Sequence, residues 1–506
     1  MKIKRKLLLI LVLGLVLPGL VACSKEASGA SDTRLVLAQI SDVTSLDPHG
    51  ANDEVSYNLV CQIFSTLVRY TEDRELVGDL AESWEEVDPR TWHFKIRPGV
   101  KFHNGEDLTL EDIKFSLERA LEKPIVAHIL EDIKEVNIIG DSTIEIRTYE
   151  PSAPLMANLA SPTASILHEE TVRSLGEEVD QKPNGTGPFK LLSWKPGEKI
   201  VLEKFEDYYG EPAAIDQAEY RVISESNSQL MALETGEIDI AYGIEPINID
   251  IVKEKEDLDY IKEDSFTVHY LGFNTQKPPF DNPKLRQAIA YAIDMDEVLE
   301  VVLDNTVRPA DCLLNDNVIG SGGEYSNYPY NKEKARELLK EAGFEDGLDM
   351  KLMISDSNIR EKISELVQAQ LREVGVNLEV EMSEWGAFLE RVGGGLHDAY
   401  LLAATVSTGD GDDPFTLLLH SNQLGDGGNR AFYVNPRVDR LIEEGRKELD
   451  PARRIEIYQE IQTIVNKELP IYPMYYNNQA CGINKRVKNF RLNPAGYHFL
   501  EKVELE

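Results

Sequence analysis

Apolar residues along this chain recur with two periods, the two-residue period of strands and the 3.6-residue period of helices. Alternation predicts a hairpin over 138–147 and strands over 34–40, 92–96, 189–194, 199–205, 237–241, 268–273, 351–354, 376–382 and 471–476. Helical spacing predicts helices after a capping box at Thr109 and over 228–233, 331–343, 359–374 and 454–467. Because helices and strands alternate after residue 331, the pattern predicts βαβ units, a mixed or parallel sheet and an α/β fold.

Two strong breaks interrupt this pattern. They are Pro183-Asn184-Gly185-Thr186-Gly187-Pro188 and Lys277-Pro278-Pro279-Phe280-Asp281, and both are rich in residues that helices and central strands tolerate poorly. The breaks divide the chain, and a length of 506 residues favours roughly three domains. The sequence contains no tandem repeat, low-complexity tract or run of coiled-coil heptads.

The first residues have the pattern of an export signal. Four cations within 2–6 precede an apolar run over 7–17, which is too short to span a bilayer comfortably. Leu20-Val21-Ala22-Cys23 follows and resembles a bacterial lipobox. We therefore expect residues 1–22 to be removed as a lipoprotein signal peptide and Cys23 to carry lipid. The alternative is an ordinary signal peptide that contains a Cys.

Charge and cysteine content narrow the possible partners. A formal net charge of −36 repels nucleic acid and anionic lipid surfaces, so no nucleic-acid partner is expected, although simple solubility explains such a charge equally well. No later segment is long and apolar enough for a transmembrane helix. Cys61, Cys312 and Cys481 cannot build a disulfide framework; at most one bridge forms, and buried inert thiols are the favoured interpretation.

Local motifs for catalysis or metal binding are missing from the sequence. There is no Ser nucleophile elbow, zinc-binding His pair or phosphate-binding Walker loop. The acidic run 410–413 suggests calcium, but it lacks the glycine at loop position six, and Ser421 stands where a bidentate Glu is needed. We therefore expect no metal, no cofactor and no enzyme, while catalytic groups far apart in sequence would escape such a search.

Five strings, in order along the chain, resemble the large solute-binding proteins of ATP-driven (ABC) importers for dipeptides, oligopeptides and nickel, solute-binding protein family 5. The strings are Ser45-Leu46-Asp47-Pro48, then Leu80-Ala81-Glu82-Ser83-Trp84 with 92–105, Asn184-Gly185-Thr186-Gly187-Pro188-Phe189, 279–294, and Gly409-Asp410-Gly411-Asp412-Asp413-Pro414. Together they cover essentially all of 34–500, which makes the resemblance specific.

This resemblance implies a two-lobed periplasmic-binding-protein-like fold of type 2, with an extra small domain on the first lobe. The expected first lobe combines 34–60, 187–272 and 476–506, the extra domain is 61–186, and the second lobe is 275–474. Two crossing strands would join the lobes, with hinges near Leu271 and Pro473.

The resemblance also implies where a peptide would bind. Asp410, in a loop with Thr408 and Gly409, would pair with the α-ammonium of the peptide, because an enclosed ammonium needs a counter-charge. The alternative is a surface loop in which Asp413-Pro414 begins a helix. In this hypothesis Asp410 faces the cleft and contributes little to folding.

Other expected binding residues lie elsewhere along the chain. Asn52, Asp53 and Glu54 would line the cleft on the first lobe, and Trp385 would pack on the ligand, unless it is a core Trp at the start of a helix. For the peptide carboxylate, the nearest cations are Arg360 and Lys362, with Arg360 favoured as a solvated helix residue. Ser407 and Ala404 replace a Trp and an Arg found in many relatives, which leaves the ligand class open.

The resulting hypothesis is a monomeric lipoprotein on the extracytoplasmic face of the bacterial membrane. It would capture short peptides and deliver them to the permease subunits of an ABC importer. A non-peptide solute such as a nickel chelate, sugar or opine is the first alternative. An exported hydrolase or an anchored sensor is a further alternative from another functional class.

Overall fold

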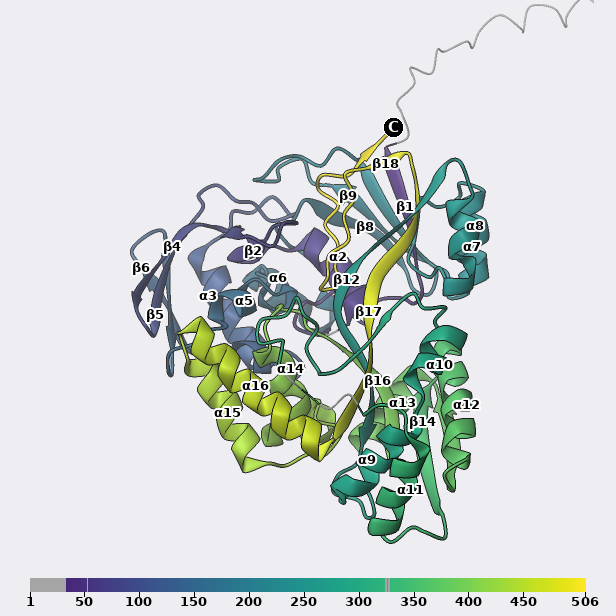
Figure 1. The fold of residues 1–506 in the computed structure, drawn as a ribbon. Coiled ribbons are helices and arrows are strands. Elements are labelled where there is room, and N and C mark those ends of the chain that lie inside the picture. Colours follow the sequence, from purple (N-terminus) through teal and green to yellow (C-terminus); the bar gives the residue numbers. More distant parts are fainter. Residues whose placement is uncertain (1–32, 52, 324, 326–327) are drawn as a thin grey trace, which may run out of the picture. The chain divides into compact units, whose positions relative to one another are not determined.

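The computed structural model describes residues 33–51, 53–323, 325 and 328–506. Its largest sheet has eleven strands (Figure 1). In spatial order, ten of them are β15 (Val376–Ser383), β14 (Leu348–Ser355), β16 (Ala399–Thr405), β12 (Leu258–Phe273), β17 (Ile471–Asn484), β11 (Ile240–Ala241), β1 (Arg34–Gln39), β10 (Gln217–Val222), β9 (Lys199–Lys204) and β8 (Phe189–Lys195). The short β13 (Arg308–Pro309) pairs with β17 beside this path.

Two long antiparallel strands, β12 and β17, connect the two halves of this sheet. Their pairing runs from Leu258 opposite Asn484 to Gly272 opposite Ile471. β17 continues onto β11 in one half, and β12 continues onto β16 in the other. Both strands are longer than predicted. Their register shifts between Asp264 and Val268 and again after His269, so the irregular pairing precedes Leu271 rather than lying at it.

The half of the sheet that contains β1 has its own core. β1 is parallel to β10 and β11, and β9 and β8 continue antiparallel to the edge. The helices of this part are α2 (Glu54–Ile63), α7 (Ser226–Glu234) and α8 (Ile249–Lys253). The core packs the apolar face of α2 against β1, β8, β9 and the C-terminal segment.

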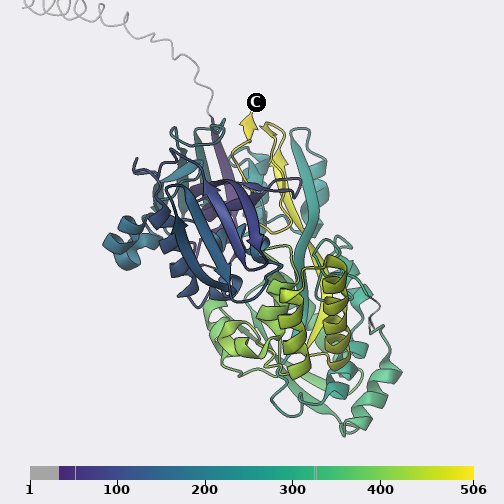
Figure 2. The same ribbon diagram turned by 90° about the vertical axis from the view of Figure 1, so that its left-hand side faces the viewer.

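A second, smaller sheet lies in the region expected as the extra domain (Figure 2). It is antiparallel, with the order β4 (Ala81–Asp88), β5 (Thr91–Ile96), β7 (Thr143–Thr148) and β6 (Ile133–Ile139). Around it are β2 (Val68–Tyr70), β3 (Leu76–Gly78), α3 (Leu110–Leu121), α4 (Ala127–Leu130), α5 (Leu155–Leu159) and α6 (Glu169–Leu175). The predicted capping box of Thr109 with Asp112 is confirmed, and this sheet has a separate hydrophobic core.

The other half of the large sheet contains the predicted βαβ units. β14 is parallel to both β15 and β16. The helices here are α9 (Pro283–Ala292), α10 (Met295–Val301), α11 (Lys332–Glu341), α12 (Asn358–Arg372), α13 (Trp385–Gly393), α14 (Asp412–Leu419), α15 (Pro436–Lys447) and α16 (Pro451–Glu468). The predicted helices over 331–343, 359–374 and 454–467 are confirmed, and Asn331 caps the first of them.

Minor elements complete the fold. A two-stranded sheet pairs β18 (Val487–Lys488) with β19 (Glu504–Leu505). Single 3₁₀ turns occur at Pro162–Ala164, Gly176–Asp180, Pro246–Asn248, Ser421–Gln423 and Gly425–Gly427. Sequence patterning missed α2, β4, β10, α9, β16 and α15 but found the long helices α3, α11, α12 and α16.

The glycine-rich break before β8 packs directly on the C-terminal end of α2. The amide of Gly187 donates to the carbonyl of Ile63 at 2.8 Å. A Cβ added at Gly187 would lie 2.4 Å from the Gln62 carbonyl oxygen, and one at Gly185 would lie 2.1 Å from the Ile63 carbonyl oxygen. Only glycine permits this approach of two backbones, so the break fixes the position of α2.

Replacing Gly187 with Ala should therefore destabilise the fold. Overlap with a backbone that cannot move aside is expected to cost about 1–3 kcal/mol, measured as the free energy of unfolding in urea. The matched control is Gly386→Ala in α13, where an added Cβ meets only the Glu384 side chain at 3.3 Å. That variant should be neutral or slightly stabilised. Equal unfolding free energies for the two variants would contradict the backbone-packing explanation.

Candidate functional site

The loop between β16 and α14 contains Asp410, the residue predicted to bind a peptide ammonium. Its side chain is 2% exposed and lies against Arg454 of α16. Arg454 donates from Nη1 to Oδ2 at 2.6 Å and from Nη2 to Oδ1 at 2.8 Å. The main-chain amide of Asp412 donates to Oδ1 as well, at 2.9 Å. Both carboxylate oxygens are therefore occupied within the protein.

This geometry corrects the expectation that Asp410 faces the cleft with a free carboxylate. Its counter-charge is already supplied by Arg454, and the pair fastens the loop to α16. The alternative expectation was a helix that begins at Asp413-Pro414. The structure has this helix, α14, which begins at Asp412. Arg454 lies 44 residues further along the chain, so no local sequence pattern indicated that it pairs with Asp410.

Thr408 and Gly409 shape the same loop. The Thr408 hydroxyl accepts a hydrogen bond from the Asp410 amide at 3.2 Å. Gly409 has a φ of +73°, and its carbonyl accepts from the Ile319 amide at 3.0 Å. Thr408 is buried, so the structure uses these two residues to set the turn.

The two other acids of the loop also have partners. Asp413 accepts from the Ser407 amide at 3.1 Å and from its hydroxyl at 3.2 Å. Asp412 accepts from Arg446 Nε at 3.0 Å, an interaction that sequence reasoning missed. Desolvation by burial raises the pKa of Asp412 to about 6, with Arg446 opposing the rise.

The residues expected from the first lobe lie at the start of α2. Asp53 caps this helix, accepting from the Ser56 amide at 2.9 Å, and also accepts from the Thr44 hydroxyl at 2.5 Å. Its carboxylate is thus committed to the helix terminus. Asn52 lies outside the described residues.

Glu54 is the accessible acid of this group. Solvent reaches its side chain, yet protein surrounds the carboxyl closely: a Cβ on Gly496 would lie 2.5 Å from Glu54 Cδ. Desolvation in this crowded environment raises its pKa to about 7, and a hydrogen bond with Gln479 of β17 opposes the rise. Glu54 therefore lies beside β17 without a cationic partner among the ion pairs of the described residues.

Trp385 is not a core residue. It begins α13, is 40% exposed and stacks on Phe388 with ring centroids 5.9 Å apart. The guanidinium carbon of Arg360, at the start of α12, lies 5.7 Å from the Trp385 ring centroid. An accessible indole beside an arginine is a platform that a planar or anionic group can contact.

Arg360 is half-buried, in contrast to the solvated helix residue that we expected. It donates to the Ser355 hydroxyl, and within the described part of the chain no carboxylate lies within ion-pairing distance of it. Desolvation lowers its pKa, which means that burial of its charge is incompletely compensated. Lys362 is exposed on the same helix.

The crossing strands form the surface beneath Arg360. His269 of β12 and Tyr475 of β17 stack with centroids 4.4 Å apart and an interplanar angle of 10°. Burial lowers the pKa of His269 to about 3, and the nearby charge of Arg360 lowers it further. His269 is therefore neutral at physiological pH and adds no second cation.

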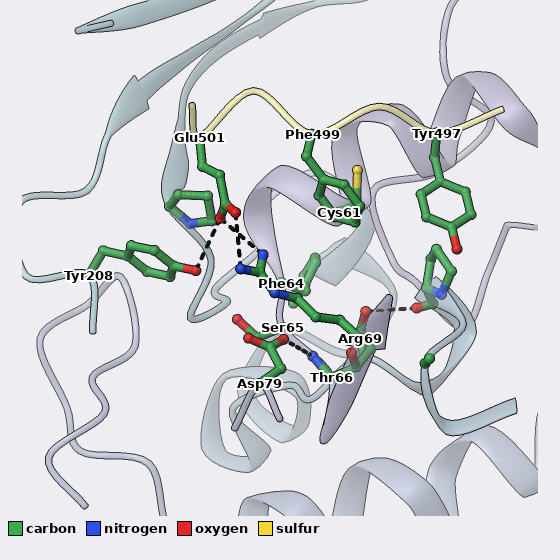
Figure 3. A pocket seen from close by; sticks show the side chains of 14 residues that line it. Cys61, Phe64, Ser65, Thr66, Arg69, Asp79, Tyr208, Tyr497, Phe499 and Glu501 are labelled. Atoms are coloured by element: carbon green, nitrogen blue, oxygen red, sulfur yellow. Dashed lines mark hydrogen bonds and ion pairs between the residues drawn. The ribbon is translucent and has the colours of Figure 1, made fainter. Parts of the chain in front are cut away.

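A cavity elsewhere is too small for a solute of this kind (Figure 3). It measures about 30 Å³, room for one or two water molecules. Arg69 of β2 and Glu501 form an ion pair across it, with Nη1 3.0 Å from Oε2. The pair ties the C-terminal segment to the β2–β3 hairpin, so this cavity is part of the scaffold.

The remaining predictions about chemistry concern metals, thiols and membranes. Cys61, Cys312 and Cys481 are free thiols, and burial raises the pKa of all three. Within the described ranges no cluster of His, Cys, Asp or Glu is arranged to hold a metal ion. A search of the same residues for a helix long and apolar enough to cross a membrane finds none. The predicted lipidation site, Cys23, lies outside the described residues.

Two α/β halves joined by long crossing strands are the architecture of the periplasmic-binding-protein fold, and the solved structure of a periplasmic binding protein shares it. A family sequence model of the bacterial extracellular solute-binding proteins, family 5, matches residues 75–426, and the chain belongs to this family. The resemblance found in the sequence is thereby confirmed.

Named relatives agree with this family. The dipeptide-binding protein of Escherichia coli K12 is 28% identical over 464 residues, covering 85% of this chain and 86% of its own. A glutathione-binding protein of Pectobacterium atrosepticum is 29% identical over 483 residues, covering 93% and 94%. A solved structure of a Helicobacter pylori ABC transporter-associated periplasmic binding protein with peptide STSA has a TM-score of 0.88 and 28% identity, covering 94% of this chain and 98% of that one.

Removal of the Asp410 carboxylate should destabilise the protein. Asp410→Ala strands the Arg454 guanidinium in a buried site, which is expected to cost about 3–5 kcal/mol in unfolding free energy. The paired variant Asp410→Leu with Arg454→Met removes both charges and should recover most of that loss. Thermal and urea unfolding measure both variants. An Asp410→Ala variant as stable as the wild type would restore the original interpretation of a cleft-facing acid.

Proposed function

We propose that this protein captures short peptides outside the cytoplasm and delivers them to the permease of an ABC importer, held at the membrane by lipid on Cys23. Family membership supports solute binding for import. Relatives named for dipeptides and glutathione, and a structural neighbour holding the peptide STSA, favour peptides as the solute class. The absence of a local catalytic motif in the sequence favours binding over an exported hydrolase.

The observation that carries the peptide proposal is the state of Arg360. Its guanidinium is half-buried against Trp385 and has no carboxylate partner among the described residues. The planar guanidinium can donate two parallel hydrogen bonds to a carboxylate. The proposed anion is the peptide C-terminus.

The positions of Glu54 and Arg360 along β17 indicate how long the ligand would be. Tyr475, near Arg360, and Gln479, bonded to Glu54, are four residues apart on β17, so their side chains share a face. Four residues of a strand span about 13 Å. An extended peptide of about three or four residues covers the same length. We therefore assign Glu54 as the partner of the peptide α-ammonium, in place of Asp410.

The alternative is a non-peptide anion such as a nickel chelate, an opine or a sugar acid. Arg360 would bind the carboxylate of such a solute equally well, so the end groups of the ligand separate the two proposals. Native mass spectrometry of the purified protein identifies whichever solute remains bound.

The peptide proposal predicts that both ends of the ligand matter. Tetraalanine should bind the wild type, and its C-terminal amide should bind about 30- to 4,000-fold more weakly, the effect of a lost charge partner worth about 2–5 kcal/mol. Arg360→Met should weaken tetraalanine to a similar degree and make it insensitive to amidation. Isothermal titration calorimetry measures each dissociation constant.

The control for this experiment is Lys362→Met, which removes an exposed cation from the same helix and should leave affinity unchanged. Equal affinity of the wild type for the acid and the amide would contradict the role of Arg360. In that case a solute recovered by native mass spectrometry would replace the peptide in the proposal.

The anchor gives an independent prediction. Cys23→Ser should abolish lipid modification and release the protein from the membrane fraction into the periplasm or medium. Membrane fractionation with metabolic labelling by a fatty acid measures both effects. A Cys23→Ser variant that remains in the membrane fraction would refute the lipobox interpretation of Leu20-Val21-Ala22-Cys23.

A further inference from the structure

Arg446 is a largely buried cation where two parts of the molecule meet. It lies near the end of α15, and its side chain is 12% exposed. Within its own part, Nε donates to Asp412 at 3.0 Å and Nη2 donates to the Thr416 hydroxyl at 2.7 Å. Both partners belong to α14, so α14 and α15 fix the direction of the guanidinium.

The remaining nitrogen of this guanidinium contacts the small domain that contains the four-stranded sheet. Nη1 lies 2.5 Å from Glu131 Oε1 and 3.5 Å from Asp132 Oδ1, in the turn between α4 and β6. The Arg446 carbonyl accepts a hydrogen bond from the Ala153 amide at 2.9 Å. Asp132 is itself held by the Ser152 hydroxyl at 2.6 Å. One arginine thus joins α14 and α15 to two acids and a backbone amide of the other part.

This contact links two hydrophobic cores that share no residue. One core belongs to the small sheet, and the other lies between β12, β16 and helices α13–α16, with Tyr57 of α2 and Tyr497 of the C-terminal segment packed into it. The contact itself is polar: besides Arg446, His128 Nε2 lies 3.8 Å from Asp413 Oδ1. Separation of the two surfaces would expose charged groups, which water solvates well.

The contact also connects to the acidic loop that contains Asp410. Asp412 lies two residues after Asp410, and its amide donates to the Asp410 carboxylate. Arg446, Asp412, Asp410 and Arg454 therefore form one continuous chain of charged groups. Burial raises the pKa of Asp132 as it does that of Asp412, because both carboxyls are removed from water at this contact.

We propose that Arg446 is a clasp residue, which positions the second lobe against the extra domain and stabilises the arrangement that encloses the solute. This inference rests on the proposed function and the expected hinge motion about β12 and β17. Contacts made only in the enclosed arrangement shift the population toward it and slow solute release.

The variant that tests the clasp is the double substitution Glu131→Gln with Asp132→Asn. It removes the charges on the far side and leaves Arg446 paired with Asp412 and Thr416. The matched control is Glu118→Gln, which breaks the exposed pair with Lys114 in the same small domain. Glu118→Gln should melt like the wild type, and the double variant should melt at a lower temperature because Arg446 loses two carboxylate partners. The distances are therefore measured well below both melting temperatures.

The measurement is a distance distribution from spin labels at Lys134→Cys and Lys447→Cys, one on each side of the contact, with and without tetraalanine. In the double variant we expect the ratio of short to long distances to fall by about 5- to 150-fold, the usual range of such couplings. The dissociation rate of tetraalanine should rise by a similar factor. Glu118→Gln should match the wild type in both measurements.

Two results would overturn the clasp. One is an unchanged distance ratio in the double variant, and the other is a wild type that shows only the long distance in every sample. Failure of tetraalanine to bind the wild type would instead contradict the peptide proposal. The distance comparison in the free protein would then still decide the role of Arg446.

Discussion

The antiparallel pairing of β12 with β17 is the interaction on which the rest of this molecule depends. It carries the chain between the two halves of the eleven-stranded sheet, and its register shifts near Val268, where one half gives way to the other. Main-chain hydrogen bonds of this kind do not depend on side-chain identity. The pairing therefore holds the two halves together whatever side chains the strands carry, and the buried Tyr475 and Gln479 lie on one face of β17.

Paired charges give the acidic loop 407–413 its conformation. Asp410 is held by Arg454, Asp412 by Arg446 and Asp413 by the backbone and hydroxyl of Ser407. A loop fixed in this way loses little further freedom when a solute binds, which favours affinity. Arg360, which has no carboxylate partner in the part of the chain that the structure describes, is then a group available to recognise an anion.

The sequence predicted elements well where the signal was local. The helix after Asn331 and the capping box at Thr109 follow from residues within one turn, and both are confirmed. The first part of β12 was missed because charged residues such as Lys262 and Glu263 break its alternation, and distant pairing with β17 supplies its hydrogen bonds. The resemblance directed attention to the acidic loop, but it could not reveal that the Asp410 carboxylate is already paired with Arg454. The site depends on such long-range pairs, and so it was less predictable than the fold.

The dependence of the loop on α15 and α16 has a consequence for engineering and for evolution. Because Arg446 and Arg454 come from those helices, the segment 407–413 cannot be grafted alone into another scaffold. A chimera that exchanged only this segment would bring Asp410 and Asp412 and leave their counter-ions, Arg454 and Arg446, behind. Recombination that transfers this acidic loop within the family must therefore carry the loop and the helical pair as one module.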